Sequence, residues 1–400
     1  MRILHTADWH MGKRLHQYEL AADMDRFIEW LVELVKEQQI DAVLVSGDIF
    51  DLANPSAAAR QQYYEALVRL QQLQCTLIIT GGNHDSPSML NAPKSLLSAL
   101  NIHVVGQMPD DPAAVLIPLG APVQAVVAAV PYLRDADLLQ YVKDETYAQR
   151  EEAVKAGIAR MFQQVAEAAT QRYPGTPLIG MGHLFTAGAS MSDSERDIQV
   201  GTLGAFPVDH FPAAFDYLAL GHIHRPQEPD KRAWYSGSPI PLSFSEHADP
   251  KRVVIYDTTT QEKTSHSIPV FRQLIRIAGS YAHCQAELQQ IAVPDTQLPA
   301  LIELTLEEPR YEPGKRVALE ELVDQFEHPR ASIIKHRLHF AQTAKDTRHL
   351  FEASSVSIAE LSPRQVFSER MEEEEVPAEQ KQLLQAAFDE LLDVVQQNES

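Results

Sequence analysis

The chain of 400 residues carries a formal net charge of −21 and is 44% hydrophobic, which is ordinary for a globular protein of two or three domains. Its sequence contains no apolar stretch near the roughly 20 residues that span a bilayer, and no apolar signal-peptide region follows the first methionine, so we expect no membrane segment. The two distant cysteines, Cys75 and Cys284, suit a reducing compartment, and we expect a cytoplasmic protein.

The acidic balance bears on the choice of partners. A charge of −21 repels a polyanion at long range and by itself disfavours nucleic acid. The charge is unevenly spread, because residues 371–400 hold nine acidic residues and one lysine. Carboxylates that bind divalent cations are also offset by those cations. The charge therefore argues against a nucleic-acid substrate without excluding one.

The first part of the chain alternates β-rich runs with helical stretches. Strands are predicted at residues 2–6, 41–48 and 76–80, with amphipathic helices at 27–38 and 57–73, and further β-rich runs follow at 123–130, 177–183, 215–224 and 252–258. Buried strands separated by helices indicate an α/β fold, and these strands are too many for one small sheet. Over residues 1–267 we expect a β-sandwich of two sheets flanked by helices.

The character of the sequence changes near residues 267–271. Strand, helix, strand, helix and strand are predicted in turn at residues 273–279, 282–291, 300–308, 316–326 and 332–340, which indicates a compact α/β domain at 268–345. A polar and acidic segment follows at 346–400. Its last predicted helix places Leu384, Phe388, Leu391 and Val395 on one face. That face either packs on its own domain or binds a partner from a tether, and the sequence leaves both open.

Side chains with metal-binding atoms follow five of the predicted strands. Functional groups of an open α/β sheet gather beyond the carboxyl ends of its strands. In chain order these positions carry Asp8 and His10, Asp48, Asn83 and His84, His183, and His222 and His224. A lone histidine after a strand is usually an ordinary polar residue, and a lone aspartate usually forms a turn. Five such strand ends exceed what chance supplies, so we expect one shared site.

The predicted donors are nitrogen and oxygen atoms without cysteine sulfur. Such a set favours borderline ions such as Mn, Fe, Co or Zn over Ca or Mg. Two pairs of the donors are separated by one residue, so in extended chain each pair can face one ion. With His84 set aside the donors outnumber what one ion needs, and two ions about 3.5–4 Å apart would use them. Asp48, in the middle of the set, is the best bridging ligand.

The stretch "GGNHD" at residues 81–85 ends the third predicted strand. The glycines allow a tight turn, while Asn83 reaches a metal and His84 does not. His84 is then available for proton chemistry, and the nearby Asp51 could orient its imidazole as carboxylates do in other acid–base pairs. For Asp85 we expect the ordinary role of a turn former or helix cap.

Together these motifs resemble those of the calcineurin-like metallophosphoesterases. The patterns D-x-H, G-D-x-x-D, G-N-H-D, G-H and G-H-x-H stand here as "DWH", "GDIFD", "GNHD", "GH" and "GHIH". Longer stretches, such as "MRILHTADWHMGKRL", "GHLFTAGASMSDSERDIQVGT" and "YSGSPIPLSFSE", are similar to the SbcD family, the nuclease subunits of bacterial SbcCD complexes. The likeness is strong over about the first 260 residues and looser beyond them.

The resemblance implies a role for each residue of the site. One Mn²⁺ ion would be held by Asp8, His10, Asp48 and His224, and a second Mn²⁺ by Asp48, Asn83, His183 and His222. His84 would protonate the leaving oxygen or stabilise the transition state. Some relatives have a histidine where this chain has Asp51, the expected helper of His84.

The resemblance also implies an activity and partners. The expected activity is hydrolysis of DNA, from duplex ends and at hairpins and single strands, in DNA repair, recombination and replication. Residues 268–345 would form a capping domain, and 346–400 would bind an SbcC-type coiled-coil ATPase, with a homodimer inside a two-plus-two heterotetramer. The loop at 188–198 could contact the DNA backbone or be an ordinary surface loop, and the stretch 236–244 is expected to support the site from behind.

Two other functions stay open at this point. The first is a metallophosphoesterase that acts on a phosphoprotein, a cyclic nucleotide or a nucleotide-linked lipid, which the added α/β domain and terminal helix disfavour. The second is a non-catalytic scaffold that keeps metal for structure. An imidazole that binds no metal, as expected for His84, disfavours the scaffold, because a structural site has no use for one.

Overall fold

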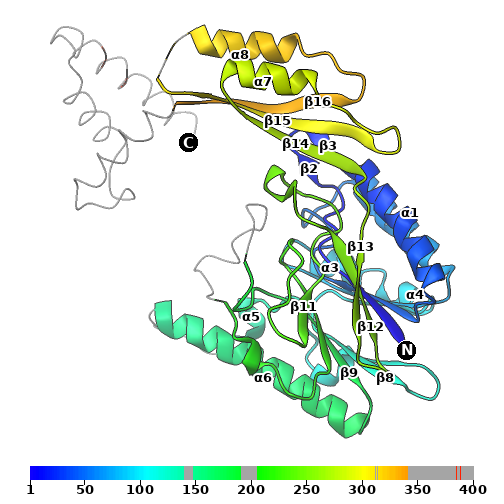
Figure 1. Ribbon diagram of the computed structural model, residues 1–400. Coiled ribbons are helices and arrows are strands. Elements are labelled where there is room, and N and C mark those ends of the chain that lie inside the picture. Colours follow the sequence, from blue (N-terminus) through cyan, green and yellow to red (C-terminus); the bar gives the residue numbers. More distant parts are fainter. Residues whose placement is uncertain are drawn as a thin grey trace.

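The computed structural model describes residues 1–138, 147–190, 205–310, 312, 314–340, 384 and 388. Two stacked sheets with helices outside them form the larger part, and a three-stranded sheet with two helices follows in the chain (Figure 1). The predicted fold class, a β-sandwich flanked by helices with a smaller α/β domain, is confirmed. Within the described residues, none of the helices has the length and apolar character that a membrane span needs.

The first sheet has six strands in the order β13-β12-β1-β4-β5-β6. Its strands are β1 (Arg2–Thr6), β4 (Ala42–Ser46), β5 (Thr76–Thr80), β6 (Ile102–Val105), β12 (Arg252–Asp257) and β13 (Lys263–Ser267). Strands β1, β4, β5 and β6 are parallel, and β12 and β13 extend the sheet in antiparallel pairing. The carboxyl ends of the parallel strands therefore share one edge.

The second sheet has five strands in the order β11-β10-β9-β8-β7. They are β7 (Leu116–Leu119), β8 (Ala125–Ala129), β9 (Leu178–His183), β10 (Tyr217–Gly221) and β11 (Ala233–Tyr235). Strands β8 to β11 run parallel, and β7 is antiparallel to β8. Strands β6, β7, β11 and β13 were not predicted, because they are short or lie at the sides of the sheets.

Helices cover the outer faces of both sheets (Figure 1). The first sheet is covered by α1 (Ala21–Glu37), α2 (Ala57–Gln71), α3 (Pro87–Asn91) and α4 (Lys94–Ser98), and the second by α5 (Asp135–Leu138) and α6 (Tyr147–Arg172). Three 3₁₀ turns, η1 (Pro112–Val115), η2 (Val208–His210) and η3 (Phe244–Glu246), and the hairpin β2 (Arg14–Leu15) with β3 (Tyr18–Glu19), lie in the connections. The long helix α6 was not predicted.

Strand β4 shows why the sequences of the central strands are continuous apolar runs. Ala42 and Leu44 are fully buried against the second sheet, whereas Val43 and Val45 are buried on the opposite face against the helices. Successive side chains of a strand point to opposite faces, so a strand between two apolar layers needs apolar residues at every position. Complete burial of a valine or leucine side chain of this kind stabilises the fold by about 1.5–3 kcal/mol.

His5 is a polar exception inside this core. Its Nδ1 lies 2.8 Å from the Tyr217 hydroxyl and its Nε2 lies 3.2 Å from the Leu220 carbonyl oxygen. A carbonyl only accepts, so Nε2–H donates to Leu220 and the tyrosine hydroxyl donates to Nδ1. Complete burial lowers the pKa of His5 to about 3, and the ring is neutral in the folded protein.

We expect His5 to make the protein less stable in mild acid. Between pH 6.5 and pH 3 the unfolded chain binds a proton that the folded chain does not, so the free energy of unfolding falls as the pH falls. Between pH 7 and pH 5 this loss amounts to about 2 kcal/mol. Urea unfolding of wild type and His5→Gln at both pH values measures it: the variant should lose less stability, and parallel losses would contradict the prediction.

The smaller domain is built on parallel strands in the order β14-β15-β16. Its elements are β14 (Arg272–Gly279), α7 (Tyr281–Gln289), β15 (Leu298–Glu308), α8 (Gly314–Asp324) and β16 (Ala331–Phe340). Both helices lie on the face of the sheet that points away from the two-sheet domain (Figure 1). Ile302 and Leu304 face these helices, whereas Leu301 on the other face belongs to the core of the first domain.

A buried ion pair joins the two parts of the chain. The Arg272 guanidinium of β14 contacts the Asp23 carboxylate of α1 with its Nε at 2.8 Å, and its carbon lies 4.8 Å from the centre of the Tyr18 ring. The contact links the two parts of the chain, and the division between residues 267 and 268 stays a prediction. Of the predicted terminal helix, Leu384 and Phe388 are helical, and the rest of residues 346–400 lie outside the described residues.

Candidate metal centre

The predicted donors meet where the two sheets come together at the carboxyl ends of their strands. Strands β1, β4 and β5 supply donors from the first sheet, and β9 and β10 supply them from the second. The Ser46 hydroxyl at the end of β4 donates to the Ala219 carbonyl of β10 at 2.9 Å, so the sheets are in direct contact here. Parallel strands place their ends at one edge, and stacking two such sheets joins the two edges.

Asp48 lies at the centre of the group. Its Oδ2 is 3.3 Å from His183 Nε2, 3.5 Å from His10 Nε2 and 4.0 Å from His84 Nε2. Its Oδ1 accepts a hydrogen bond from the His84 main-chain N–H at 2.9 Å. Asp48 therefore faces histidines that come from three different strand ends.

Donor atoms gather on both sides of Asp48. On one side, Nε2 of His10 and Nε2 of His224 are 3.1 Å apart, and these two rings form a group with Asp8 in which one donor atom from each residue lies within 4.8 Å of the others. The other side holds a second group with the same spacing. Its members are Asp48, His183 and His222, and Asn83 Oδ1 lies 2.9 Å from His183 Nε2 and 3.2 Å from His222 Nδ1. The structure thus brings all seven predicted ligands together.

Several buried polar atoms in the centre make no hydrogen bond. Among the described residues, Asp8 Oδ2 and His222 Nε2 have no partner although both are shielded from water. Leaving buried polar groups without partners is costly unless something else binds them. The mixed oxygen and nitrogen donors suit a divalent transition ion, and the pair of groups around Asp48 suits two. The residues present therefore fit the metals expected from the sequence.

The main chain is strained at four of the predicted ligands. Asp8, His10, Asp48 and His222 have φ angles of 53°, 45°, 45° and 98°, in the left-handed region that non-glycine residues seldom occupy. The strain is held by bonds from the opposite loops: the His222 N–H donates to Asp8 Oδ1 at 2.9 Å, and the His10 N–H donates to the Asp48 carbonyl at 2.9 Å. Strain of this kind concentrates at functional sites.

Two glycines make room for this packing. A Cβ atom on Gly82 would lie 2.1 Å from Asp48 Oδ1, and one on Gly47, where φ is 83°, would lie 2.0 Å from His183 Nδ1. The second glycine of "GGNHD" is thus required by the approach of Asp48, in addition to any need of the turn.

Two of the histidines, His183 and His224, are oriented by groups on their far sides. The His183 Nδ1–H donates to the Ser46 carbonyl at 3.0 Å, which leaves Nε2 pointing into the centre. Behind His224, Nδ1 lies 3.6 Å from Glu246 Oε1, and the Lys251 ammonium donates to the His224 carbonyl at 3.1 Å. Glu246 and Lys251 form a buried pair at 2.6 Å. Sequence reasoning missed both, although the neighbouring stretch 236–244 was expected to support the site.

The pKa values of Asp8, Asp48 and His183 show how burial affects the charged groups of the centre. Burial raises the pKa of Asp8 to about 7. Burial also opposes ionisation of Asp48, but the charges of His183 and His10 hold its pKa well below its usual range. Burial lowers the pKa of His183, yet the Asp48 carboxylate raises it to about 9. A bound cation would replace the proton on His183 and leave that ring neutral, as a metal ligand must be.

Asp51 does not orient His84 in the way the sequence suggested. His84 Nδ1–H donates to the main-chain carbonyl of Asp51 at 2.8 Å. The Asp51 carboxylate faces elsewhere, 3.3 Å from His10 Nδ1 and 3.0 Å from the Lys13 ammonium. Burial opposes ionisation, but His10 and Lys13 lower the pKa of Asp51 to about 2. The carboxylate therefore holds His10, and the local turn sends the carbonyl of the same residue toward His84.

Asp85 is more than a simple turn former. Its buried carboxylate accepts hydrogen bonds from the main-chain N–H groups of Ile49 and Phe50, at 3.0 Å each, and of Gly82 at 2.8 Å. It ties the loop after β4 to the loop after β5, which carry Asp48 and the "GGNHD" residues. The expected turn role is met by the bond from Gly82, three residues away, and the bonds from Ile49 and Phe50 add a distant role that the sequence did not indicate.

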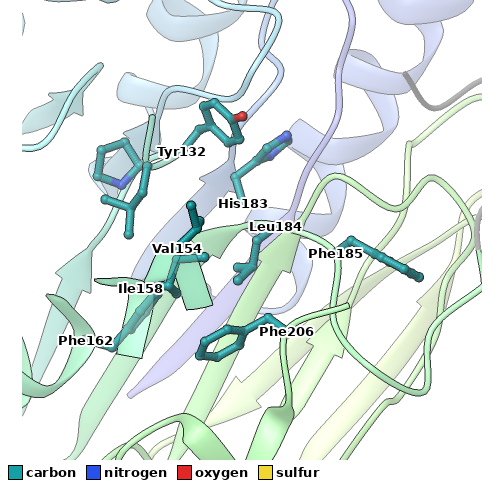
Figure 2. Close-up of a pocket in the computed structure, with 10 residues that line it drawn as sticks. Tyr132, Val154, Ile158, Phe162, His183, Leu184, Phe185 and Phe206 are labelled. Carbon is teal, nitrogen blue, oxygen red and sulfur yellow. The ribbon is translucent and has the colours of Figure 1, made fainter. Parts of the chain in front are cut away.

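An apolar pocket lies directly beside the centre. Figure 2 shows His183 and Tyr132 close together on one side of it, with Val154, Ile158, Phe162 and Phe206 across from them. Its volume is about 30 Å³, enough for about one or two water molecules and too small for a nucleotide base. The apolar residues around this small pocket therefore pack against His183 and leave no room for a substrate group.

The sequence patterns of two known families cover most of the chain. The pattern of the calcineurin-like phosphoesterases matches residues 1–226, more than half of the chain, and a second pattern, SbcD_C, described as the type 5 capsule protein repressor C-terminal domain, matches residues 270–375. The chain therefore belongs to the calcineurin-like phosphoesterases. Membership of this family indicates a hydrolytic enzyme that uses divalent metal ions.

Similar proteins of known family show which group of phosphoesterases this chain belongs to. The SbcD protein of the nuclease SbcCD from Escherichia coli K12 is 34% identical over 395 residues, which cover 97% of each chain. The SbcD protein of Rhodobacter capsulatus is 36% identical over 74% of this chain and 77% of its own, and that of Bacillus subtilis is 36% identical over 66% and 68%. Within the phosphoesterases, this protein is a member of the SbcD family.

Proposed function

We propose that this chain is the Mn²⁺-dependent nuclease subunit of an SbcCD-type complex. It hydrolyses DNA phosphodiesters as an exonuclease on duplex ends and an endonuclease on hairpins and single strands, in DNA repair, recombination and replication. The observation that carries the proposal is the position of Asp48 between two groups of donors, with His84 at its edge. This arrangement suits a two-metal centre for phosphate-ester hydrolysis.

The ligand sets follow the two groups. One Mn²⁺ ion is held by Asp8, His10, Asp48 and His224, and the second by Asp48, Asn83, His183 and His222. Bound in this way, the cations supply positive charge to the phosphate and acidify water for attack. The chain's own part is to fix the donors, which the strained loops and the far-side hydrogen bonds achieve.

His84 acts on the leaving oxygen. Its Nδ1–H is committed to the Asp51 carbonyl at 2.8 Å, so the ring offers Nε2 to the centre. To donate there, His84 must carry a proton on Nε2, which lies 4.0 Å from Asp48 Oδ2. Asp51 contributes twice to the site. Its main-chain carbonyl orients His84, and its carboxylate orients His10.

The partners come from the relatives. The E. coli relative is named as a subunit of the nuclease SbcCD and aligns with 97% of this chain. We therefore assign residues 268–345 to a capping domain and 346–400 to the binding of an SbcC-type coiled-coil ATPase, with two copies of each subunit in a cytoplasmic assembly. The homodimer inside that assembly and the DNA contact of residues 188–198 belong to the same proposal.

One observation favours a second candidate, a phosphoesterase for a substrate other than DNA. The net charge of −21 repels a polyanion unless cations or a partner offset it. A smaller phosphodiester would feel this repulsion less, because it carries fewer charges.

The test uses the purified chain with Mn²⁺ and a labelled DNA hairpin, with and without its ATPase partner and ATP. The small diester bis(p-nitrophenyl) phosphate is assayed in parallel. We expect metal-dependent hairpin cleavage that the partner with ATP increases. Turnover of the small diester with DNA intact under every condition would refute the nuclease and leave the second candidate.

A further inference from the structure

The segment after β8 lies at the same edge as the candidate metal centre, and no sequence motif marked it. Strand β8 is parallel to β9, and Ala129 pairs with Met181, so Pro131 is level with His183 at the end of β9. The Tyr132 N–H donates to the Gly81 carbonyl at 2.8 Å, which ties the segment to the loop that carries His84.

Arg134 ends this segment with its side chain beside the "GGNHD" loop. The guanidinium Nη2 donates to the main-chain carbonyl of Asp85 at 3.2 Å, one residue from His84. Its main-chain N–H donates to Asp137 Oδ2 at 2.8 Å at the start of α5, which fixes the backbone. Arg134 is half-buried, so part of the residue is open to solvent.

Other cations around the centre are already bound to carboxylates. Lys13 lies 3.0 Å from Asp51. Two more follow the same pattern: Lys251 lies 2.6 Å from Glu246, and Arg225 lies 3.0 Å from Asp249. Within the part of the chain that the structure describes, Arg134 makes no contact with a carboxylate through its guanidinium. The contact with the Asp85 carbonyl uses one nitrogen of the guanidinium, and a DNA phosphate that reaches the centre must approach several buried carboxylates.

We propose that Arg134 is a positioning residue that binds a phosphate of the DNA next to the one being cleaved. The inference rests on the proposed function and deepens it. A guanidinium is planar and always charged, and it can bind two phosphate oxygens at once. The Asp85 carbonyl holds it near His84, so the bound phosphate keeps the strand in register with the donors around Asp48.

The experiment measures kcat and KM for cleavage of a DNA hairpin by the full chain with Mn²⁺, at several KCl concentrations between about 50 and 200 mM. The proteins are wild type, Arg134→Gln, Arg134→Lys and the control Arg172→Gln. Arg172 is an exposed arginine at the end of α6, near the opposite, amino-terminal end of β9. Hydrolysis of bis(p-nitrophenyl) phosphate, bound Mn and the melting temperature are measured on the same preparations.

For Arg134→Gln we expect KM for DNA to rise about tenfold, as for loss of a charge-assisted hydrogen bond. The slope of log KM against log [KCl] should fall by about 0.7–0.9, the value of one phosphate contact. Arg134→Lys should restore the slope and part of the affinity, because it keeps the charge and loses the two-pronged geometry. Turnover of the small diester, bound Mn and the Arg172→Gln control should be unchanged.

Two results would overturn the inference in different ways. If wild type cleaves DNA but Arg134→Gln keeps the full salt slope, or loses turnover of both substrates equally, Arg134 acts only by holding the loop of Asp85. If wild type hydrolyses the small diester and no DNA, the proposed nuclease function fails, and the phosphate contact fails with it.

Discussion

Replacing Asp48 by asparagine should lower the turnover of DNA by on the order of 10³-fold or more, with loss of bound Mn. Asparagine has nearly the same shape and can still accept the His84 N–H through its side-chain oxygen. It removes the negative charge that lies 3.3–4.0 Å from three histidines and between the two groups of donors. The fold should therefore survive while the centre loses its shared ligand.

The control is Asp41→Asn, the same chemical change on an exposed residue just before β4. Bound Mn is measured by elemental analysis after dialysis, and folding by thermal unfolding of the metal-free proteins. Asp41→Asn should match wild type in turnover and in bound Mn. An Asp48→Asn protein that keeps more than about a tenth of the turnover would show that Asp48 is not the bridging ligand.

Replacing His84 by alanine should lower DNA turnover by about 10²–10⁴-fold while bound Mn is retained. His84 is expected to protonate the leaving oxygen, and a nucleoside alkoxide needs that proton. The p-nitrophenolate ion is a much better leaving group and needs it far less. Hydrolysis of bis(p-nitrophenyl) phosphate should therefore fall much less in His84→Ala than cleavage of DNA does.

The comparison separates proton chemistry from metal binding. His84 Nε2 also lies near His10 and Asp48, so a ligand role is geometrically open to it. In that case His84→Ala would lose Mn and would lose both activities to the same extent. His339→Ala, at an exposed histidine on β16, serves as the control and should behave as wild type.

Much of the fold could be predicted because local sequence and global structure agree. Strands buried on both faces, such as β4, need apolar residues at every position, and the helices show the spacing of one apolar face. Predicted and observed elements of the smaller domain differ by at most a few residues at their ends. The long helix α6 and the short strands at the sides of the sheets were not predicted.

The candidate ligands could also be found from the sequence. Parallel strands place their carboxyl ends at a common edge, so polar residues after β1, β4, β5, β9 and β10 had to lie near one another once the strands formed two stacked sheets. Residue type and strand position together were enough. No knowledge of distances was needed to select the seven candidate ligands, and the separate role of His84 stays a prediction.

Tertiary structure alone decided which group faces which. Asp51 is close to His84 in the sequence-based picture, yet its carboxylate binds His10 and Lys13. Asp85 joins two loops more than thirty residues apart, and Arg134 reaches the Asp85 carbonyl from the end of β8. The sequence determined the residue types at the strand ends. Side-chain partners depend on how separate loops pack, and this information is not local to any motif.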